Sequence, residues 1–210
     1  MFRCYNMSMD SGISVERRIP QQERGERRVR DLLEAAAAEF AEVGYEAATM
    51  KAIATRAGAS IGAVYQYFPN KVAVVRALRT QYVLEMEEHW RKLEETTAGL
   101  SIKERAHRFI DMMIGFMEKH PAYATIIDAP IDSKRDKKTR DRLREQLADV
   151  FRTRRPAVSQ EQAYRVACVS LQIIKGMNAL YAEARPEERV EIVKEYKLAL
   201  AAYLAERWAS

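Results

Sequence analysis

Two short helix signals joined by a tight turn constrain this chain more than any other feature. They lie in residues 49–71. Thr49 is placed to cap a first helix, and Gly58 stands where a left-handed residue ends many helices. Ser60 is placed to cap a second helix, which Pro69 prevents from continuing. Helix, glycine-containing turn and helix together predict a helix-turn-helix.

The charge pattern around this stretch favours a surface that faces phosphates. No Asp or Glu occurs in residues 47–84, although the chain contains 30 acidic residues. The basic residues of this window are Lys51, Arg56, Lys71, Arg76 and Arg79. Such a local excess is typical of nucleic-acid-binding surfaces. The net charge of +5 is weaker evidence, because the first third of the chain is nearly balanced in charge.

A series of residues in this region matches a known family pattern in type and spacing. The matching residues are Gly44, Tyr45, Thr49, Ile53, Ala54, Ala57, Gly58, Ala59, Ser60, Gly62, Ala63, Tyr65, Gln66, Tyr67, Phe68, Asn70 and Lys71. Residues 27–78 therefore resemble the DNA-binding domain of the tetracycline-repressor (TetR) family of bacterial regulators. Val64, where leucine is common, and Val72-Ala73, in place of a frequent acidic residue, are mild departures.

The resemblance implies a division of labour on double-stranded DNA. Phosphates would be held by Thr49, Tyr65, Tyr67 and Lys71, with Lys51 beside them, and base edges would be met by Ser60, Ile61, Gly62 and Ala63. Arg27 and Arg28, near the start of the first helix, could reach a phosphate or the minor groove. Equally, they could belong to a solvated, charged helix start.

Helical periodicity fills the rest of the chain, without a strand pattern. Beyond the two short helices, we expect helices near residues 27–43, 71–97, 102–120, 123–127, 136–152, 160–184 and 187–208. Ser101 with Glu104 and Ser159 with Gln162 fit capping boxes at two helix starts. The prediction is an all-α chain of about nine helices: a disordered tail (1–24), a three-helix helix-turn-helix domain (25–72) and a C-terminal helical bundle (73–210).

The last two long helices are apolar on more than one side, which indicates that they bury a second face. A central helix of a monomeric bundle would explain this, but the family resemblance favours a homodimer. The expected dimer residues are Val169, Ile173, Val193, Tyr196, Leu200, Tyr203 and Leu204. A two-fold dimer would present two recognition helices to successive major grooves of a palindromic operator.

The resemblance also implies a small-molecule effector pocket inside the C-terminal bundle. Adaptable apolar side chains are the candidates: Trp90, Phe109, Met112, Met113, Phe116, Met117, Tyr123, Ile127, Met177 and Tyr181. The alternative for each of them is ordinary core packing. An effector would act by preferring one dimer geometry over another.

Other classes of function find little support. Glu104-x-x-His107 has the spacing of di-metal bundles, but the partner glutamates and second Glu-x-x-His motif are missing, so we expect no metal, cofactor or catalytic site. Cys4 and Cys168 suggest no disulfide, and no apolar run or leader points to a membrane. We expect a cytoplasmic protein.

The basic block at residues 134–155 is read as the solvated face of an amphipathic helix rather than as a second nucleic-acid surface. The functional prediction is a ligand-responsive, homodimeric transcriptional regulator, and a repressor by family habit. The alternative is a helical ligand-binding or adaptor dimer without specific DNA binding.

Overall fold

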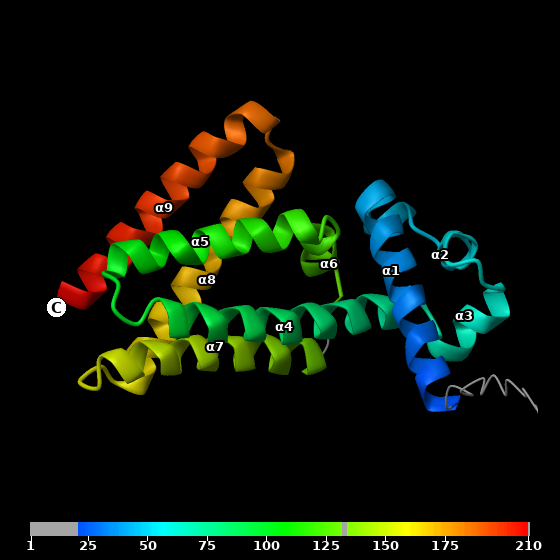
Figure 1. The fold of residues 1–210 in the computed structure, drawn as a ribbon, viewed down its shortest axis with the longest axis horizontal. Coiled ribbons are helices and arrows are strands. Elements are labelled where there is room, and N and C mark those ends of the chain that lie inside the picture. Colours follow the sequence, from blue (N-terminus) through cyan, green and yellow to red (C-terminus); the bar gives the residue numbers. More distant parts are fainter. Residues whose placement is uncertain (1–20, 132–133, 210) are drawn as a thin grey trace, which may run out of the picture.

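The computed structural model describes residues 21–131 and 134–209. Within these ranges the chain forms nine helices and no strand, which confirms the predicted all-α fold. Figure 1 shows three N-terminal helices beside a larger helical bundle. The predicted tail falls mostly outside the described residues, and its last part, residues 21–24, is helical instead.

The N-terminal unit consists of α1 (Gln21–Ala47), α2 (Met50–Arg56) and α3 (Ile61–Tyr67). Its buried side chains come from all three helices and include Phe40, Ile53 and Val64. Helical geometry breaks inside α1 at Gly44, where φ is 79° and ψ is 172°. Because L side chains rarely adopt this φ, glycine ends the regular part of the helix here.

The helix α4 (Lys71–Thr96) runs from this unit along the bundle (Figure 1). Its N-cap is Asn70, whose Oδ1 accepts a hydrogen bond from the Ala73 amide at 2.9 Å. With 26 residues and a rise of about 1.5 Å per residue, α4 is about 39 Å long. It therefore crosses the predicted boundary between residues 72 and 73 without interruption.

Four further long helices complete the bundle: α5 (Ile102–Lys119), α7 (Lys134–Arg154), α8 (Gln160–Glu183) and α9 (Pro186–Ala209). The helix α8 packs against α7 and α9, and α9 packs against α5. The capping box of Ser101 and Glu104 is present with both of its hydrogen bonds. At Ser159 the serine half is present, because its Oγ accepts from the Gln162 amide at 3.2 Å.

The short helix α6 (Tyr123–Asp128) connects the two parts of the molecule, since it packs against α1, α4 and α8. The guanidinium of Arg79 on α4 holds its C-terminal end, and we call this set of contacts the Arg79 clamp. It donates to the carbonyl oxygens of Ile126 (2.9 Å), Ile127 (3.1 Å), Ala129 (2.8 Å) and Ile131 (3.2 Å). One side chain thus satisfies carbonyl groups that have no partner within α6.

Replacing Arg79 by methionine is expected to lower the free energy of unfolding by about 1–3 kcal/mol, because part-buried carbonyls lose their donor. The matched control is Arg91→Met on the same helix. Arg91 is exposed and forms ion pairs with its helical neighbours Glu88 and Glu95, so its loss should lower the free energy of unfolding much less than the loss of Arg79. Urea unfolding at one fixed protein concentration measures both, and equal losses would contradict the clamp.

Candidate nucleic-acid interface

The turn between α2 and α3 is fixed by backbone hydrogen bonds. Gly58 has a φ of 58°, and its amide donates to the Thr55 carbonyl at 3.1 Å. The next amide, of Ala59, donates to the Ala54 carbonyl at 2.9 Å. These two bonds form a Schellman motif, which requires a left-handed residue and therefore favours glycine. The predicted turn chemistry is confirmed.

Both helices begin at the predicted caps. The Thr49 side chain accepts from the Ala52 amide at 3.1 Å, and the Ser60 side chain accepts from the Ala63 amide at 3.2 Å. Each bond satisfies one of the amides that a helix leaves unpaired at its start. The Thr49 cap sets where α2 starts, and the Ser60 cap sets where α3 starts and hence which side chains of α3 turn outward.

The helix α3 has one buried and one exposed side. Val64 and Phe68 are buried against the core of the N-terminal unit. On the other side, Ile61, Tyr65 and Tyr67 are 41%, 51% and 39% exposed.

Small residues lie beside these exposed side chains. Gly62 is exposed, and a Cβ built on it would meet no atom within 4 Å. The protein's own packing therefore does not require glycine at this position. Ser60 is exposed and Ala63 half-buried, so the start of α3 offers a low surface to an approaching molecule.

The basic residues of the acid-free window largely have partners inside the protein. Arg56 pairs with Glu39 at 3.2 Å and with Glu42, both on α1, and their hydrogen bonds, that of Glu42 first, raise its pKa. Arg79 is used in the clamp on α6. Lys51 is exposed on α2. The acid-free window therefore overstated the positive charge available to a phosphate. Carboxylates of α1 pair with Arg56, and backbone carbonyls near α6 accept hydrogen bonds from Arg79.

Lys71 has a structural environment that the sequence did not predict. Its ammonium group donates to the carbonyl oxygens of Tyr45 (2.5 Å), Glu46 (3.0 Å) and Ala48 (3.0 Å), and it lies 4.4 Å from the centre of the Tyr45 ring. Lysine has three N–H donors, and all three are used. These contacts occupy the Lys71 ammonium within the protein, and its contact with a phosphate stays a prediction.

Arg27 and Arg28 lie within α1 rather than in an extended arm. Arg27 is exposed and Arg28 half-buried.

The basic helix α7 carries ion pairs such as Arg142 with Glu87 at 3.1 Å and Arg144 with Asp141 at 2.9 Å. This pairing agrees with the interpretation of α7 as an ordinary charged surface.

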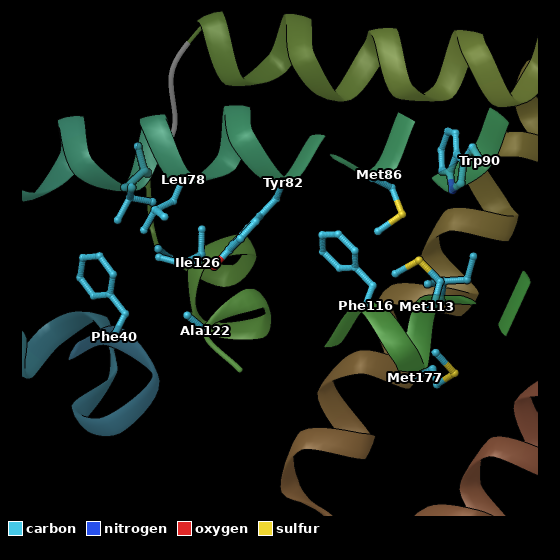
Figure 2. Close-up of a cluster of buried hydrophobic side chains, with 14 of the residues drawn as sticks. Phe40, Leu78, Tyr82, Met86, Trp90, Met113, Phe116, Ala122, Ile126 and Met177 are labelled. Atoms are coloured by element: carbon cyan, nitrogen blue, oxygen red, sulfur yellow. The ribbon is translucent and has the colours of Figure 1, made fainter. Parts of the chain in front are cut away.

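Most of the residues predicted to form an effector pocket belong to the core instead. Trp90, Met113, Phe116, Met117, Met177 and Tyr181 are buried, and Figure 2 shows five side chains of this region gathered together: Met86, Trp90, Met113, Phe116 and Met177. Phe116 contacts the rings of Tyr82 and Tyr123, with centroids 5.9 and 5.1 Å apart. Met112, Tyr123 and Ile127 are half-buried.

A cavity of about 380 Å³ lies elsewhere in the bundle, between the C-terminal end of α4 and helices α5, α7, α8 and α9. Of the ten predicted pocket residues, only Phe109 lines it. The sequence reasoning missed its other walls, including Leu147 and Phe151 of α7 and Ser170 of α8. Helical periodicity indicates which apolar residues of a helix face inward, but it does not show which of them meet around one space, and it gives no signal for a serine such as Ser170.

The predicted dimer residues divide into two groups. Leu200 and Leu204 are buried within the protomer, so the prediction that they lie at the dimer interface was wrong. Val169 is 43% exposed, and Ile173, Val193, Tyr196 and Tyr203 are half-buried. The exposed large apolar residues of these two helices are Val169 and Leu180 on α8 and Val190 and Leu198 on α9.

Comparison with known proteins agrees with this architecture. Residues 32–78 match the family model described as "Bacterial regulatory proteins, tetR family", and residues 101–204 match "Tetracyclin repressor-like, C-terminal domain". The chain belongs to the TetR family. The first model covers the helix-turn-helix of this TetR-family chain, and the second covers α5 to α9. The family consists of regulators, in agreement with the prediction that the chain is not an enzyme.

Two curated relatives match parts of the chain. The uncharacterized HTH-type transcriptional regulator YhgD of Bacillus subtilis is 30% identical over 89 residues, 42% of this chain. The HTH-type transcriptional repressor KstR of Mycobacterium tuberculosis is 37% identical over 75 residues, 35% of this chain. The matches span 46% and 34% of the lengths of these relatives, so less than half of either.

Solved structures share the fold over most of the chain. A TetR-family regulator from Streptomyces coelicolor superposes with a TM-score of 0.65 at 23% identity, covering 85% of this chain and 98% of its own. The fatty acid degradation regulator FadR from Bacillus halodurans gives 0.59 at 16% identity, covering 83% and 94%. At these identities the likeness concerns the fold alone.

In residues 21–131 and 134–209, no three His, Cys, Asp or Glu side chains are grouped so that they could hold a metal ion. Glu104 acts as the capping-box partner of Ser101, whose amide donates to Glu104 Oε2 at 2.9 Å. Of the helices that the structure describes, none combines the length and the apolar character needed to cross a bilayer.

Replacing Lys71 by methionine should destabilise the TetR-family fold, because three carbonyl oxygens around the end of α1 lose their common donor. The expected loss is about 1–3 kcal/mol, and each 1 kcal/mol lowers the melting temperature by roughly 2–4 °C in a domain of this size. The control is Lys51→Met, at an exposed position of α2, which should change the melting temperature by about 1 °C or less. Thermal unfolding followed by circular dichroism measures both; equal melting temperatures would remove the structural role of Lys71.

Proposed function

We propose that this protein is a sequence-specific DNA-binding transcriptional regulator that reads the major groove with α3. The observation that carries the proposal is the exposed side of α3, where Ile61, Gly62 and Tyr65 project from a helix whose other side is buried. Apolar and aromatic side chains gathered on one side of a helix are typical of a surface that a partner covers. Gly62, with open space above it, allows a groove wall to come close to the backbone.

The contacts divide by chemistry. We propose that the hydroxyl groups of Thr49, Tyr65 and Tyr67 and the ammonium of Lys51 contact phosphates, which position the domain on the duplex. Ser60, Ile61, Gly62 and Ala63, at the start of α3, meet base edges and specify the site. Exposed Arg27 and half-buried Arg28 add positive charge on the same domain. Lys71 then acts indirectly, by holding α4 against the end of α1.

We propose that the protein acts as a homodimer. Val169, Gly176 and Leu180 follow one another at helical spacing on the exposed side of α8, and Ile173 lies between them. Val190 and Leu198 are exposed on neighbouring α9. Covering these apolar side chains with a second copy would remove them from water and place two copies of α3 on successive turns of a palindromic operator.

The regulatory sense of the proposal is repression, relieved by a small molecule. The relative KstR is named a transcriptional repressor, and the match to it supports this choice. The cavity between α4, α5, α7, α8 and α9 is the proposed place of the effector. Because the proposed target is the bacterial chromosome, we also propose a cytoplasmic location.

Selection of bound duplexes from a random library, repeated at two salt concentrations, tests the proposal. We expect an enriched palindrome whose half-sites lie about 34 Å apart, one helical turn. Weak binding that shows no sequence preference and disappears at moderate salt would contradict it and favour the ligand-binding or adaptor reading.

Gly62→Ala links this result to α3. The new methyl group meets nothing in the protein, so stability should be unchanged or higher by about 0.5–1 kcal/mol. Binding to the selected operator should weaken or change its sequence preference, because the methyl group projects into the groove. The matched control is Gly115→Ala at an exposed position of α5, which has the same open space and should leave DNA binding unchanged. Equal operator binding by both variants would exclude close approach at Gly62.

A further inference from the structure

Five helices contribute walls to the cavity of about 380 Å³, which lies at the C-terminal end of α4. This end of α4 is the one far from the helix-turn-helix (Figure 1). Its volume falls within the range of about 300–1,000 Å³ that is usual for small-molecule sites. Apolar side chains make most of the wall, among them Phe109 of α5, Leu147 and Phe151 of α7, and Leu200 and Leu204 of α9. Such a lining favours an apolar body of corresponding size.

Four polar side chains line the same cavity, and two of them have their hydrogen bonds inside the protein. The Thr97 hydroxyl donates to the Leu93 carbonyl at 2.7 Å. The Arg105 guanidinium donates from Nε to the Leu100 carbonyl at 2.9 Å and from Nη2 to the Ala98 carbonyl at 2.5 Å. These bonds hold the loop between α4 and α5 and direct much of the guanidinium toward carbonyls rather than toward a ligand.

Ser170 differs from these residues. It is 2% exposed in the middle of α8, and its Oγ has no hydrogen-bond partner among the described residues. A buried hydroxyl without a partner costs free energy, and most buried polar groups avoid this state. Ser170 lines the cavity, but in its present side-chain orientation the Oγ has almost no accessible surface. Rotation about χ1 turns the hydroxyl toward the space, where a molecule can supply the missing partner.

The charges at the cavity are balanced in sign. Glu94 contributes a carboxylate and Arg105 a guanidinium. An anionic ligand would have to leave water for an apolar space in which the one cation already serves two carbonyls, and this transfer is costly. A cationic ligand would have to compete for Glu94, which has a partner of its own. A neutral ligand meets neither cost.

We infer that the cavity binds a neutral, mainly apolar molecule with one hydroxyl or carbonyl oxygen, which hydrogen-bonds to Ser170. The inference deepens the proposed function, and rests on it, by giving the chemical class of the effector. The binding itself depends only on the residues of the cavity. It places the polar end of the molecule at α8 and its chain among the side chains of α5, α7 and α9.

Three probes with the same ten-carbon chain test the class by isothermal titration calorimetry on the full-length protein near neutral pH: 1-decanol, decanoate and decylammonium, each below its aggregation limit. We expect 1-decanol to bind and both charged probes to bind at least about tenfold more weakly. Failure of 1-decanol to bind, or tighter binding of either charged probe, would overturn the inference.

Ser170→Ala tests the hydrogen bond. The variant should bind 1-decanol roughly three- to tenfold more weakly, the change expected for one neutral hydrogen bond, while its melting temperature stays the same or rises. Gln172→Ala, exposed on the same helix and outside the cavity lining, is the control and should bind 1-decanol like the unaltered protein. Undiminished 1-decanol binding by Ser170→Ala would place the ligand elsewhere and overturn the inference.

Operator binding by the same preparations separates this inference from the proposed function. A protein that binds its selected operator but not 1-decanol contradicts the ligand class and leaves the DNA-binding proposal standing. A protein that binds 1-decanol through Ser170 but no specific DNA contradicts the proposed function and keeps the site.

Discussion

The contact between the Lys71 ammonium and the three carbonyl oxygens of Tyr45, Glu46 and Ala48 is the interaction on which the rest of the structure depends. It joins the end of α1 to the first residue of α4, with the two helices of the helix-turn-helix in between. A cation beside carbonyls at the end of a helix is also favoured by the helix dipole. Eight residues further along the same helix, Arg79 holds the carbonyls at the end of α6.

These two contacts make α4 the common support of both functional regions. Its first residue, Lys71, positions the N-terminal unit. Leu93, in its last turn, and Thr97, its C-cap, line the cavity. We propose that a ligand at the far end of α4 alters the packing of this helix and thereby the placement of α3. Such a ligand shifts the equilibrium only as far as it prefers one arrangement of the bundle over another.

The sequence predicted what local rules decide and missed what distant partners decide. Caps at Thr49 and Ser60 and the left-handed Gly58 follow from neighbouring residues, and so they were predicted correctly. The partners of Lys71 lie more than twenty residues away and are backbone atoms, which leave no mark in composition or periodicity. For the same reason, Leu200 was predicted to be buried by a partner subunit, whereas its own protomer buries it. Periodicity shows which side of a helix is buried, and tertiary packing shows what it meets.

The central claim is that α3, held by the Lys71 contact, is the surface that meets DNA. Amide hydrogen exchange of the protein with and without its selected duplex tests this claim most directly. We expect slower exchange in residues 49–70 on DNA binding, with the basic helix α7 unchanged. Slower exchange confined to α7, with α3 unaffected, would contradict this expectation and move the DNA-binding surface to the bundle.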